Sequence, residues 1–204
     1  MLKFLSHKKM IKSEQHVTSE NNKYRHMKST YFYTIGFIMI ACVFMSFKIP
    51  KNIYKKVSKE IKVVYETEDF TLNPVSISSE MTLQLITKID SSNLFQIIDT
   101  EEVVGYAFIS KAPSKTDEFD YLVLFDNNFV IKKAKVLIYR EDYGAEIGSK
   151  RWLKQFIGKK TGENLKYERD IIAISGATIS AHSMTVAINN LLKSVAILQQ
   201  QKAI

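Results

Sequence analysis

The feature that most constrains this chain is a stretch of 19 residues without charge, STYFYTIGFIMIACVFMSF (29–47), bounded on both sides by lysine. A helix of this length, rising 1.5 Å per residue, would be roughly 28 Å long, close to the ~30 Å hydrocarbon core of a bilayer. Tyr31 and Tyr33 near one end are typical of interfacial anchors. The stretch therefore predicts a single N-terminal transmembrane helix, placed at residues 31–48.

Two other interpretations of the apolar stretch fit its length and flanking residues less well. A cleaved signal peptide has an apolar core of only ~7–15 residues followed by a small-residue cleavage site, and neither feature is present. A lipoprotein signal is suggested by Met39-Ile40-Ala41-Cys42, which loosely resembles a lipid-attachment box. The apolar run continues for three residues after Cys42, however, which a mature lipoprotein does not need. The transmembrane helix remains the favoured prediction.

The charge of the chain is unevenly distributed. Residues 1–62 hold 13 Lys/Arg and 3 Asp/Glu, whereas the remainder holds 16 Lys/Arg and 18 Asp/Glu. A nearly neutral C-terminal part has no electrostatic footprint for a polyphosphate backbone, so we expect no nucleic-acid partner. The expected division is a basic cytoplasmic tail (1–30), the transmembrane helix, an amphipathic juxtamembrane linker (49–74) and a globular domain (75–204).

The expected linker has the pattern of a basic amphipathic helix. Ile53, Val57 and Ile61 are spaced four apart among lysines. Such a helix can lie on a lipid surface, or its apolar stripe can pack on the domain, and the pattern does not distinguish the two. The positive-inside rule does not decide orientation either, because residues 9–28 carry 5 Lys/Arg and residues 48–67 carry 6.

The globular part predicts an α+β fold with an antiparallel sheet. Three runs rich in β-branched and aromatic residues, 103–110, 121–126 and 129–140, indicate strands. Asp126-Asn127-Asn128 between the last two is a hairpin turn signal. Because no helical pattern separates these strands, they favour an antiparallel sheet with packed helices.

Three helices are expected around this sheet. One covers residues 78–89, a short one in 149–160 ends near Gly158, and a long one begins at about Ser180. The long helix has a predicted buried stripe of Met184, Ala187, Ile188, Leu191, Leu192, Val195 and Leu198.

The sequence lacks the residues that common catalytic and metal-binding motifs require. Gly158-Lys159-Lys160-Thr161 resembles the end of a P-loop, but the position of its first glycine is Leu153. Ser175 lacks the G-x-S-x-G frame of a hydrolase. Cys42 is the only cysteine, and the globular part holds a single histidine, His182. We assign no catalytic and no metal-binding residues.

The stretch IIAISGATIS (171–180) is the strongest candidate for a functional site. Ile171–Ile174 is expected to form a buried strand, Gly176 permits backbone angles that other residues resist, and Ala177 adds little bulk. Thr178 lies where the closing helix begins, a place that favours an anion such as phosphate. From the residues alone, its hydroxyl can cap the helix, contact a phosphate or be esterified by one.

Ser175-Gly176-Ala177-Thr178, followed by Ile179-Ser180, resembles the flavinylation motif of the FMN-binding domain family. The segment Tyr139–Lys159 is similar to the family's segment upstream of the flavin threonine. The resemblance extends over roughly residues 75–198. The family includes the FMN-carrying subunits of the sodium-translocating NADH:quinone reductase and of Rnf-type ion-translocating complexes.

The resemblance implies that a dedicated flavin transferase uses FAD to attach FMN through its phosphate to Thr178, with release of AMP. Non-covalent FMN is the fallback. It further implies an electron carrier rather than a stand-alone enzyme, with membrane redox proteins or a quinone-linked complex as partners. The expected location is the bacterial inner (cytoplasmic) membrane, with the lipid bilayer as anchor and the FMN domain outside the cytoplasm.

The resemblance also suggests roles for residues outside the motif. Tyr143-Gly144 can form a tight turn, and Glu146 can accept a hydrogen bond from the flavin ring. Trp152 or Phe156 can pack near that ring, although ordinary core packing is the preferred interpretation of both. His182, one helical turn after Thr178, can approach the phosphate, but a surface histidine is preferred. The expected cofactor-binding residues are Thr178, Ser175, Gly176, Ala177, Ser180, Glu146, Gly144, Tyr143, Trp152 and His182.

The sequence departs from the family pattern at one position. Relatives commonly carry Asp two residues before the isoleucine of Ile-Ser-Gly-Ala-Thr, and this chain has Ile172 there, with Asp170 two places earlier. The alternative hypothesis is therefore a membrane-tethered interaction or sensor module that has kept the fold without flavin. An enzyme with freely bound FMN ranks lower, since no nicotinamide-binding fingerprint is recognisable.

Overall fold

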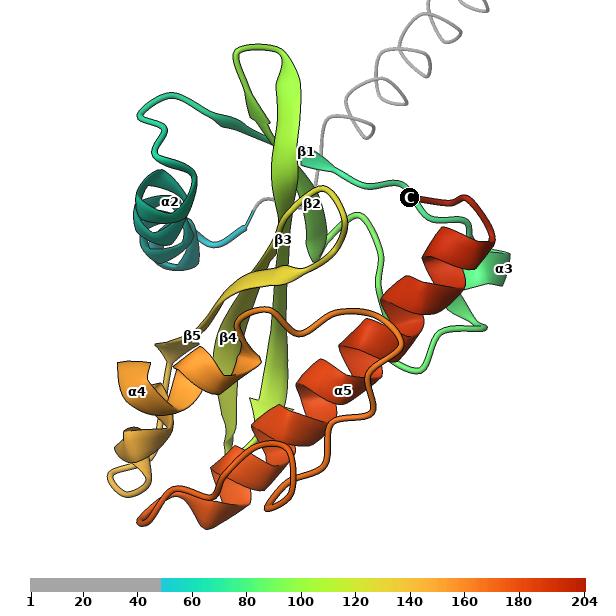
Figure 1. Cartoon of the computed structure of the whole chain (residues 1–204). Coiled ribbons are helices and arrows are strands. Elements are labelled where there is room, and N and C mark those ends of the chain that lie inside the picture. The colour runs from blue at the N-terminus through green and yellow to red at the C-terminus, as the bar shows by residue number, and fades with distance from the viewer. Residues whose placement is uncertain (1–48) are drawn as a thin grey trace, which may run out of the picture. The chain divides into compact units, whose positions relative to one another are not determined.

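Five antiparallel strands form the centre of the computed structural model, which describes residues 49–204 (Figure 1). Their order in the sheet is their order along the chain. The strands are β1 (Thr71–Pro74), β2 (Leu94–Asp99), β3 (Glu102–Pro113), β4 (Glu118–Phe125) and β5 (Ile131–Ile138). The three runs predicted as strands correspond to β3, β4 and β5, so the predicted antiparallel sheet is confirmed.

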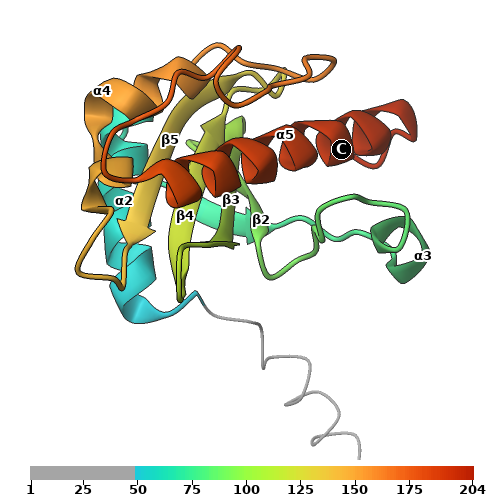
Figure 2. The ribbon, with the colours of Figure 1, turned by 90° about the horizontal axis from the view of Figure 1, so that it is seen from below.

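Helices cover both faces of this sheet (Figure 2). The helix α2 (Lys51–Tyr65) packs on one face, and the long helix α5 (Thr178–Gln200) packs on the other. The shorter helical elements are α3 (Ser79–Thr82), η1 (Ala145–Gly148), α4 (Lys150–Leu153) and η2 (Lys154–Phe156). The predicted α+β class is confirmed.

The inner strand β4 contributes to a core on each face. Leu122 and Leu124 pack in the cluster with α2, while Tyr121, Val123 and Phe125 pack in the cluster with α5. All five side chains are at most 1% exposed. Residues 121–125 of this strand therefore form a continuous apolar run, as expected when both faces of a sheet are covered.

The apolar stripe of α2 is part of this core. Ile53, Val57 and Ile61 are 6%, 0% and 0% exposed and pack against residues of the sheet. Of the two interpretations that the sequence left open, packing on the domain is the one observed. The helix α2, which lies in the segment expected to be a linker, belongs to the same compact unit as the sheet.

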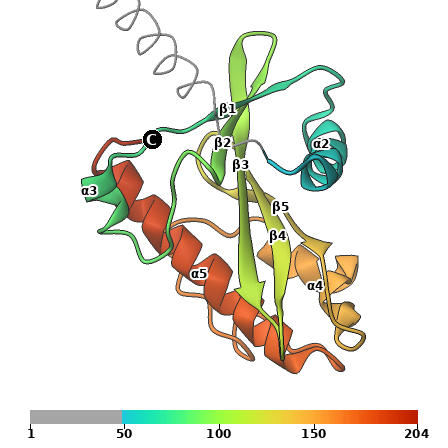
Figure 3. The same cartoon turned by 180° about the vertical axis from the view of Figure 1, so that it is seen from behind.

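The prediction of a helix over residues 78–89 was wrong beyond its first turn. Ser78 Oγ accepts the Met81 N–H at 3.2 Å, as an N-cap should, but α3 ends at Thr82. The Thr87 N–H donates to Ser194 Oγ of α5 at 2.8 Å. This contact with α5 takes the place of a hydrogen bond within a continued helix. Figures 1 and 3 show α3 beside the C-terminal half of α5.

The prediction of a buried strand at Ile171–Ile174 was also wrong. This segment makes only an isolated parallel bridge, between Tyr167 and Ile171, and the Ile172 side chain is 72% exposed. The physical reason is that side chains of Trp152 and Gln155, rather than a neighbouring strand, bind the backbone of Ile172.

Two other helix predictions were confirmed. The helical segment of α4 and η2 ends at Phe156, two residues before Gly158, which has a φ of +83°. The closing helix α5 begins at Thr178, two residues before the predicted start. Of its predicted stripe, Ala187 is half-buried and the other six residues are buried.

The predicted cytoplasmic tail and transmembrane helix lie outside the described residues. Within residues 49–204, no helix combines the length and apolar character needed to cross a membrane.

Candidate functional site

Thr178 is the first residue of α5, and its side chain is exposed. Ala177 occupies the N-cap position, no side chain caps the helix, and its first turn contains no acidic residue. Thr178 therefore does not cap the helix, and the capping interpretation was wrong. The unpaired N–H groups and the positive end of the dipole of this 23-residue helix favour an anion at Thr178.

Thr178 lines a cavity of about 280 Å³, which we call the Thr178 cavity. Its walls come from the β3–β4 loop, from the segment after β5 and from the start of α5. The cavity thus brings together six of the ten expected cofactor-binding residues. Its lining residues are Lys115, Tyr139, Glu141, Tyr143, Gly144, Gly176, Ala177, Thr178, Ile179 and Ser180.

Two glycines keep the walls of this cavity close together. Both Gly144 and Gly176 have a φ of +85°, in the left-handed region. A Cβ on Gly144 would lie 2.5 Å from the Tyr139 hydroxyl oxygen, and one on Gly176 would lie 3.0 Å from Cδ of Glu146. The Glu146 carboxylate therefore packs directly against the loop that carries the Ser-Gly-Ala-Thr motif.

Replacement of Gly176 by alanine tests this packing. We expect Gly176→Ala to lower stability by about 1 kcal/mol, because alanine resists a positive φ, and to displace the flexible Glu146 carboxylate. Gly162→Ala is the matched control, since Gly162 has a φ of +88° with nothing within 4 Å of the added Cβ. Thermal unfolding should show similar losses for both variants. A much larger loss for Gly176→Ala than for Gly162→Ala would contradict a Glu146 carboxylate that moves aside.

A hydrogen-bond network that the sequence did not reveal supports the cavity. Glu141 Oε1 accepts from the Ser114 hydroxyl and from the backbone and side chain of Thr116. It also accepts the Asp117 N–H at 3.0 Å. Glu141 thus fixes the β3–β4 loop from a position 24 or more residues away in the sequence, a separation that no local motif signals.

The hydrogen bonds to Glu141 predict an acid-dependent contribution to stability. Hydrogen bonds, first those from Thr116 N–H and the Ser114 hydroxyl, lower the pKa of Glu141 from 4.5 to about 2. Because the folded-state pKa is depressed, this contribution is fully present above pH 4.5 and is lost as the pH falls through about 2.

We therefore expect Glu141→Gln to lower the melting temperature. The difference from wild type should not vary with pH above 4.5 and should shrink between pH 4.5 and 2. Glu80→Gln, an exposed residue of α3, is the control and should change little at any pH. A wild-type-to-Gln difference that does not vary with pH would contradict this assignment.

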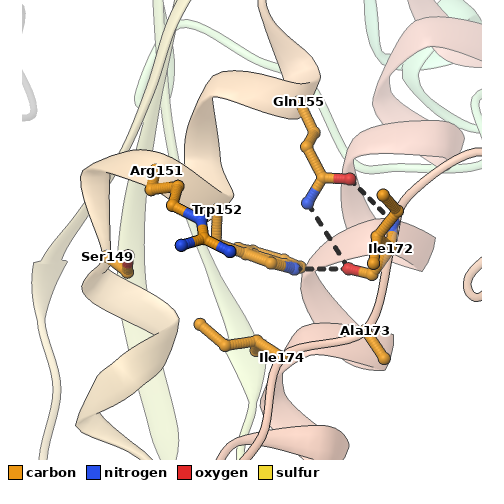
Figure 4. A pocket seen from close by; sticks show the side chains of 7 residues that line it. All are labelled: Ser149, Arg151, Trp152, Gln155, Ile172, Ala173 and Ile174. Atoms are coloured by element: carbon orange, nitrogen blue, oxygen red, sulfur yellow. Dashed lines mark hydrogen bonds between the residues drawn. The ribbon is translucent and has the colours of Figure 1, made fainter.

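A second cavity of about 440 Å³ lies beside the segment that precedes the Ser-Gly-Ala-Thr motif (Figure 4). Arg151, Trp152 and Gln155 line one side, and residues 172–174 line the other. The Trp152 Nε1–H donates to the Ile172 carbonyl at 2.7 Å, and the Ile172 N–H donates to Gln155 Oε1 at 2.7 Å. These bonds fix the backbone that leads into the motif.

The aromatic pair in this region is mainly core. Trp152 and Phe156 are 4% and 0% exposed, with their rings edge-to-face at 5.3 Å. The preferred interpretation of both residues as core is confirmed, while Trp152 also forms a wall of the second cavity. Ser175 is exposed and does not line the Thr178 cavity.

His182 and Tyr167 lie together beside the start of α5. The exposed His182 ring meets the Tyr167 ring edge-to-face at 5.5 Å and does not line the Thr178 cavity. The Tyr167 hydroxyl oxygen is buried and finds no hydrogen-bond partner in the described part of the chain. Burial and the nearby Glu168 raise the pKa of Tyr167, while the Thr178 side chain opposes this rise. The Tyr167 hydroxyl therefore lies close to the Thr178 side chain.

Residues 115–193, from the β3–β4 loop to the last third of α5, match the family model of the FMN-binding domain. This segment is an FMN-binding domain. The match begins at Lys115 and includes every residue that lines the Thr178 cavity. None of the curated proteins matches the chain.

FMN is the cofactor of this domain. The residues of the Thr178 cavity fit its phosphate end, because an exposed threonine hydroxyl, an uncapped helix N-terminus and one lysine lie together there. Gly144, where an added Cβ would lie 2.5 Å from the Tyr139 hydroxyl oxygen, fits a site in which the chain is closely packed.

Proposed function

We propose that this protein is a membrane-anchored electron carrier whose FMN is joined by a phosphoester to Thr178. The observation that carries the proposal is the position of Thr178, exposed at the uncapped start of α5 within an FMN-binding domain. A hydroxyl that neither caps the helix nor is buried is free to react.

The attachment needs no general base from the motif itself. In the proposed step, the Thr178 oxygen forms a bond to the FMN-side phosphorus of FAD while the pyrophosphate bond breaks and AMP leaves. The transferase takes the threonine proton. The uncapped N–H groups at the start of α5 would stabilise the anionic product. When bound, FMN supplies the redox chemistry, and the domain supplies position and electrostatics.

The test is whether flavin survives denaturation. Full-length protein incubated with a flavin transferase and FAD should give a fluorescent band after denaturing electrophoresis. Protein incubated with FAD alone should give none. Fluorescence that is released on denaturation would indicate non-covalent FMN, and its absence throughout would favour the interaction or sensor module.

The proposed mode of attachment supports the proposed electron-transfer role. A link through the phosphate retains the cofactor and leaves the isoalloxazine ring chemically unmodified. The attached flavin should therefore be reduced by dithionite and reoxidised by a water-soluble quinone, with no loss of flavin over repeated cycles. A flavin that stays reduced in the presence of the quinone would argue against this role.

Membrane anchoring is proposed from the apolar stretch at residues 29–47, and α2 is consistent with it. Lys51, Lys55 and Lys59 are exposed and spaced four apart on α2, where they can face anionic headgroups. The resemblance to the family suggests that the domain lies outside the cytoplasm. Protease added to intact spheroplasts should then degrade it, whereas full protection would place it inside.

The exposed Ile172 gives the proposal a variant that should gain function. The carboxylate of Asp170 is engaged in a local turn, where it binds Arg169 and accepts the Lys166 N–H. We expect Ile172→Asp to raise the rate of attachment several-fold and, since the side chain is 72% exposed, to change stability by no more than about 0.5 kcal/mol.

The control for this variant is Ile86→Asp, another exposed isoleucine, which should leave the rate unchanged. The rate is measured by intact mass at successive times with transferase and FAD. An Ile172→Asp protein that is modified no faster than wild type would show that the transferase does not use this carboxylate.

A further inference from the structure

Lys115 is the one cationic side chain that lines the Thr178 cavity within the described residues. It lies at the tip of the hairpin formed by β3 and β4 and is exposed. Within residues 49–204, no carboxylate pairs with Lys115, whereas Arg140 is paired with Asp120. Its ammonium group is therefore free to bind an anion in the cavity.

The loop that carries Lys115 has a fixed conformation. The Ser114 N–H donates to the Asp117 carbonyl at 2.7 Å, which closes the turn around Lys115. Glu141 Oε1 then accepts the Thr116 N–H at 2.6 Å and the Ser114 hydroxyl at 2.7 Å. The residues on both sides of Lys115 are thus held by one carboxylate.

The same network reaches the helix of the flavin threonine. The Tyr139 hydroxyl lies 3.5 Å from Glu141 Oε2 and 3.0 Å from the hydroxyl of Ser180. Ser180 is 3% exposed and lies in the first turn of α5, two residues after Thr178. Hydrogen bonds therefore connect the Lys115 loop to the element that presents Thr178.

We propose that Lys115 binds the phosphate of the flavin nucleotide at Thr178, and that Glu141 is a positioning residue that holds the Lys115 loop over the cavity. This inference rests on the proposed function, because it assumes FMN or FAD at this site. A unit positive charge about 4 Å from the phosphate in water changes an equilibrium by about fivefold. Loss of Lys115 should therefore have an effect of this size.

The first experiment follows FMN attachment to full-length protein by intact mass, with transferase and FAD. Lys115→Met and Glu141→Gln should each slow attachment about fivefold, and Lys115→Arg should remain close to wild type. The control is Lys193→Met, which removes the same charge from α5 about 22 Å from Thr178 and should have no effect. Glu141→Gln should add little in the Lys115→Met background if it acts through Lys115.

The second experiment separates phosphate binding from contact with the transferase. In the Thr178→Val background, where attachment cannot occur, binding of free FMN and of riboflavin is measured by fluorescence. Lys115→Met should weaken FMN binding about fivefold and leave riboflavin binding unchanged, because riboflavin has no phosphate. Equal changes for the two ligands, or no change for either, would overturn the assignment of Lys115.

The failures of the two claims are distinguishable. If wild-type protein acquires FMN and Lys115→Met acquires it equally fast, the role of Lys115 is wrong and the proposed function stands. If wild-type protein acquires no FMN, the proposed function fails and this inference fails with it. If Glu141→Gln and Lys115→Met have fully additive effects, Glu141 does not act by positioning Lys115.

Discussion

Replacement of Thr178 by valine should abolish covalent flavin while leaving the fold intact. Valine has the shape of threonine without its hydroxyl, and that hydroxyl is exposed and does not cap α5. We therefore expect a change in stability of no more than about 0.5 kcal/mol and a complete loss of the fluorescent band after denaturing electrophoresis. Circular dichroism and thermal unfolding would establish that the variant is folded.

Two variants serve as controls for Thr178→Val. Thr178→Ser keeps a hydroxyl at the same position and should retain attachment. Ser183→Ala removes a different hydroxyl of α5 and should behave like wild type. A Thr178→Val protein that still holds flavin after denaturation would place the attachment at another residue.

Replacement of Gly105 by alanine should cause the largest loss of stability. Gly105 is buried in β3, and an added Cβ would lie 2.2 Å from the Phe125 carbonyl oxygen and 2.7 Å from the Tyr65 ring. The Tyr65 hydroxyl donates to that same carbonyl at 2.6 Å, so α2 is held against the sheet at this point. The methyl group of alanine would push β3 away from the Phe125 carbonyl and from the Tyr65 side chain.

We expect Gly105→Ala to lower the free energy of unfolding by about 3 kcal/mol and the melting temperature by about 10 °C. The measurement is thermal unfolding followed by circular dichroism. Gly148→Ala is the control, since an added Cβ there meets nothing within 4 Å. Similar melting temperatures for the two variants would contradict the close approach of Tyr65, Gly105 and Phe125.

The parts of the fold that were predicted correctly are those with strong local patterns. β3, β4 and β5 are rich in β-branched and aromatic residues, and Asp126 Oδ1 accepts two N–H groups in the turn before β5. α5 has a sustained apolar stripe. These signals depend on neighbouring residues alone, and tertiary contacts agree with them.

The failures occurred where tertiary contacts override local preference. Residues 83–89 have a helical pattern, but the Thr87 N–H binds Ser194 on α5. Ile171–Ile174 has high β propensity, but side chains of Trp152 and Gln155 take its backbone groups. Neither set of partners is visible in the sequence of the segment itself.

The candidate site shows the same division. Six of the residues predicted from the resemblance to a family line one cavity: Tyr143, Gly144, Gly176, Ala177, Thr178 and Ser180. Lys115 and Glu141 were missed, because their roles depend on hydrogen bonds between segments that are more than 20 residues apart. A lysine in a hairpin loop has no sequence signal that separates it from an ordinary surface lysine.

Peptide mapping of the full-length protein after incubation with a flavin transferase and FAD is the most direct test of the central claim. Intact mass should increase by one FMN residue, and the increase should lie on the peptide from Asp170 to Lys193, at Thr178. An unmodified peptide from protein that was incubated with an active transferase would contradict covalent attachment at this threonine.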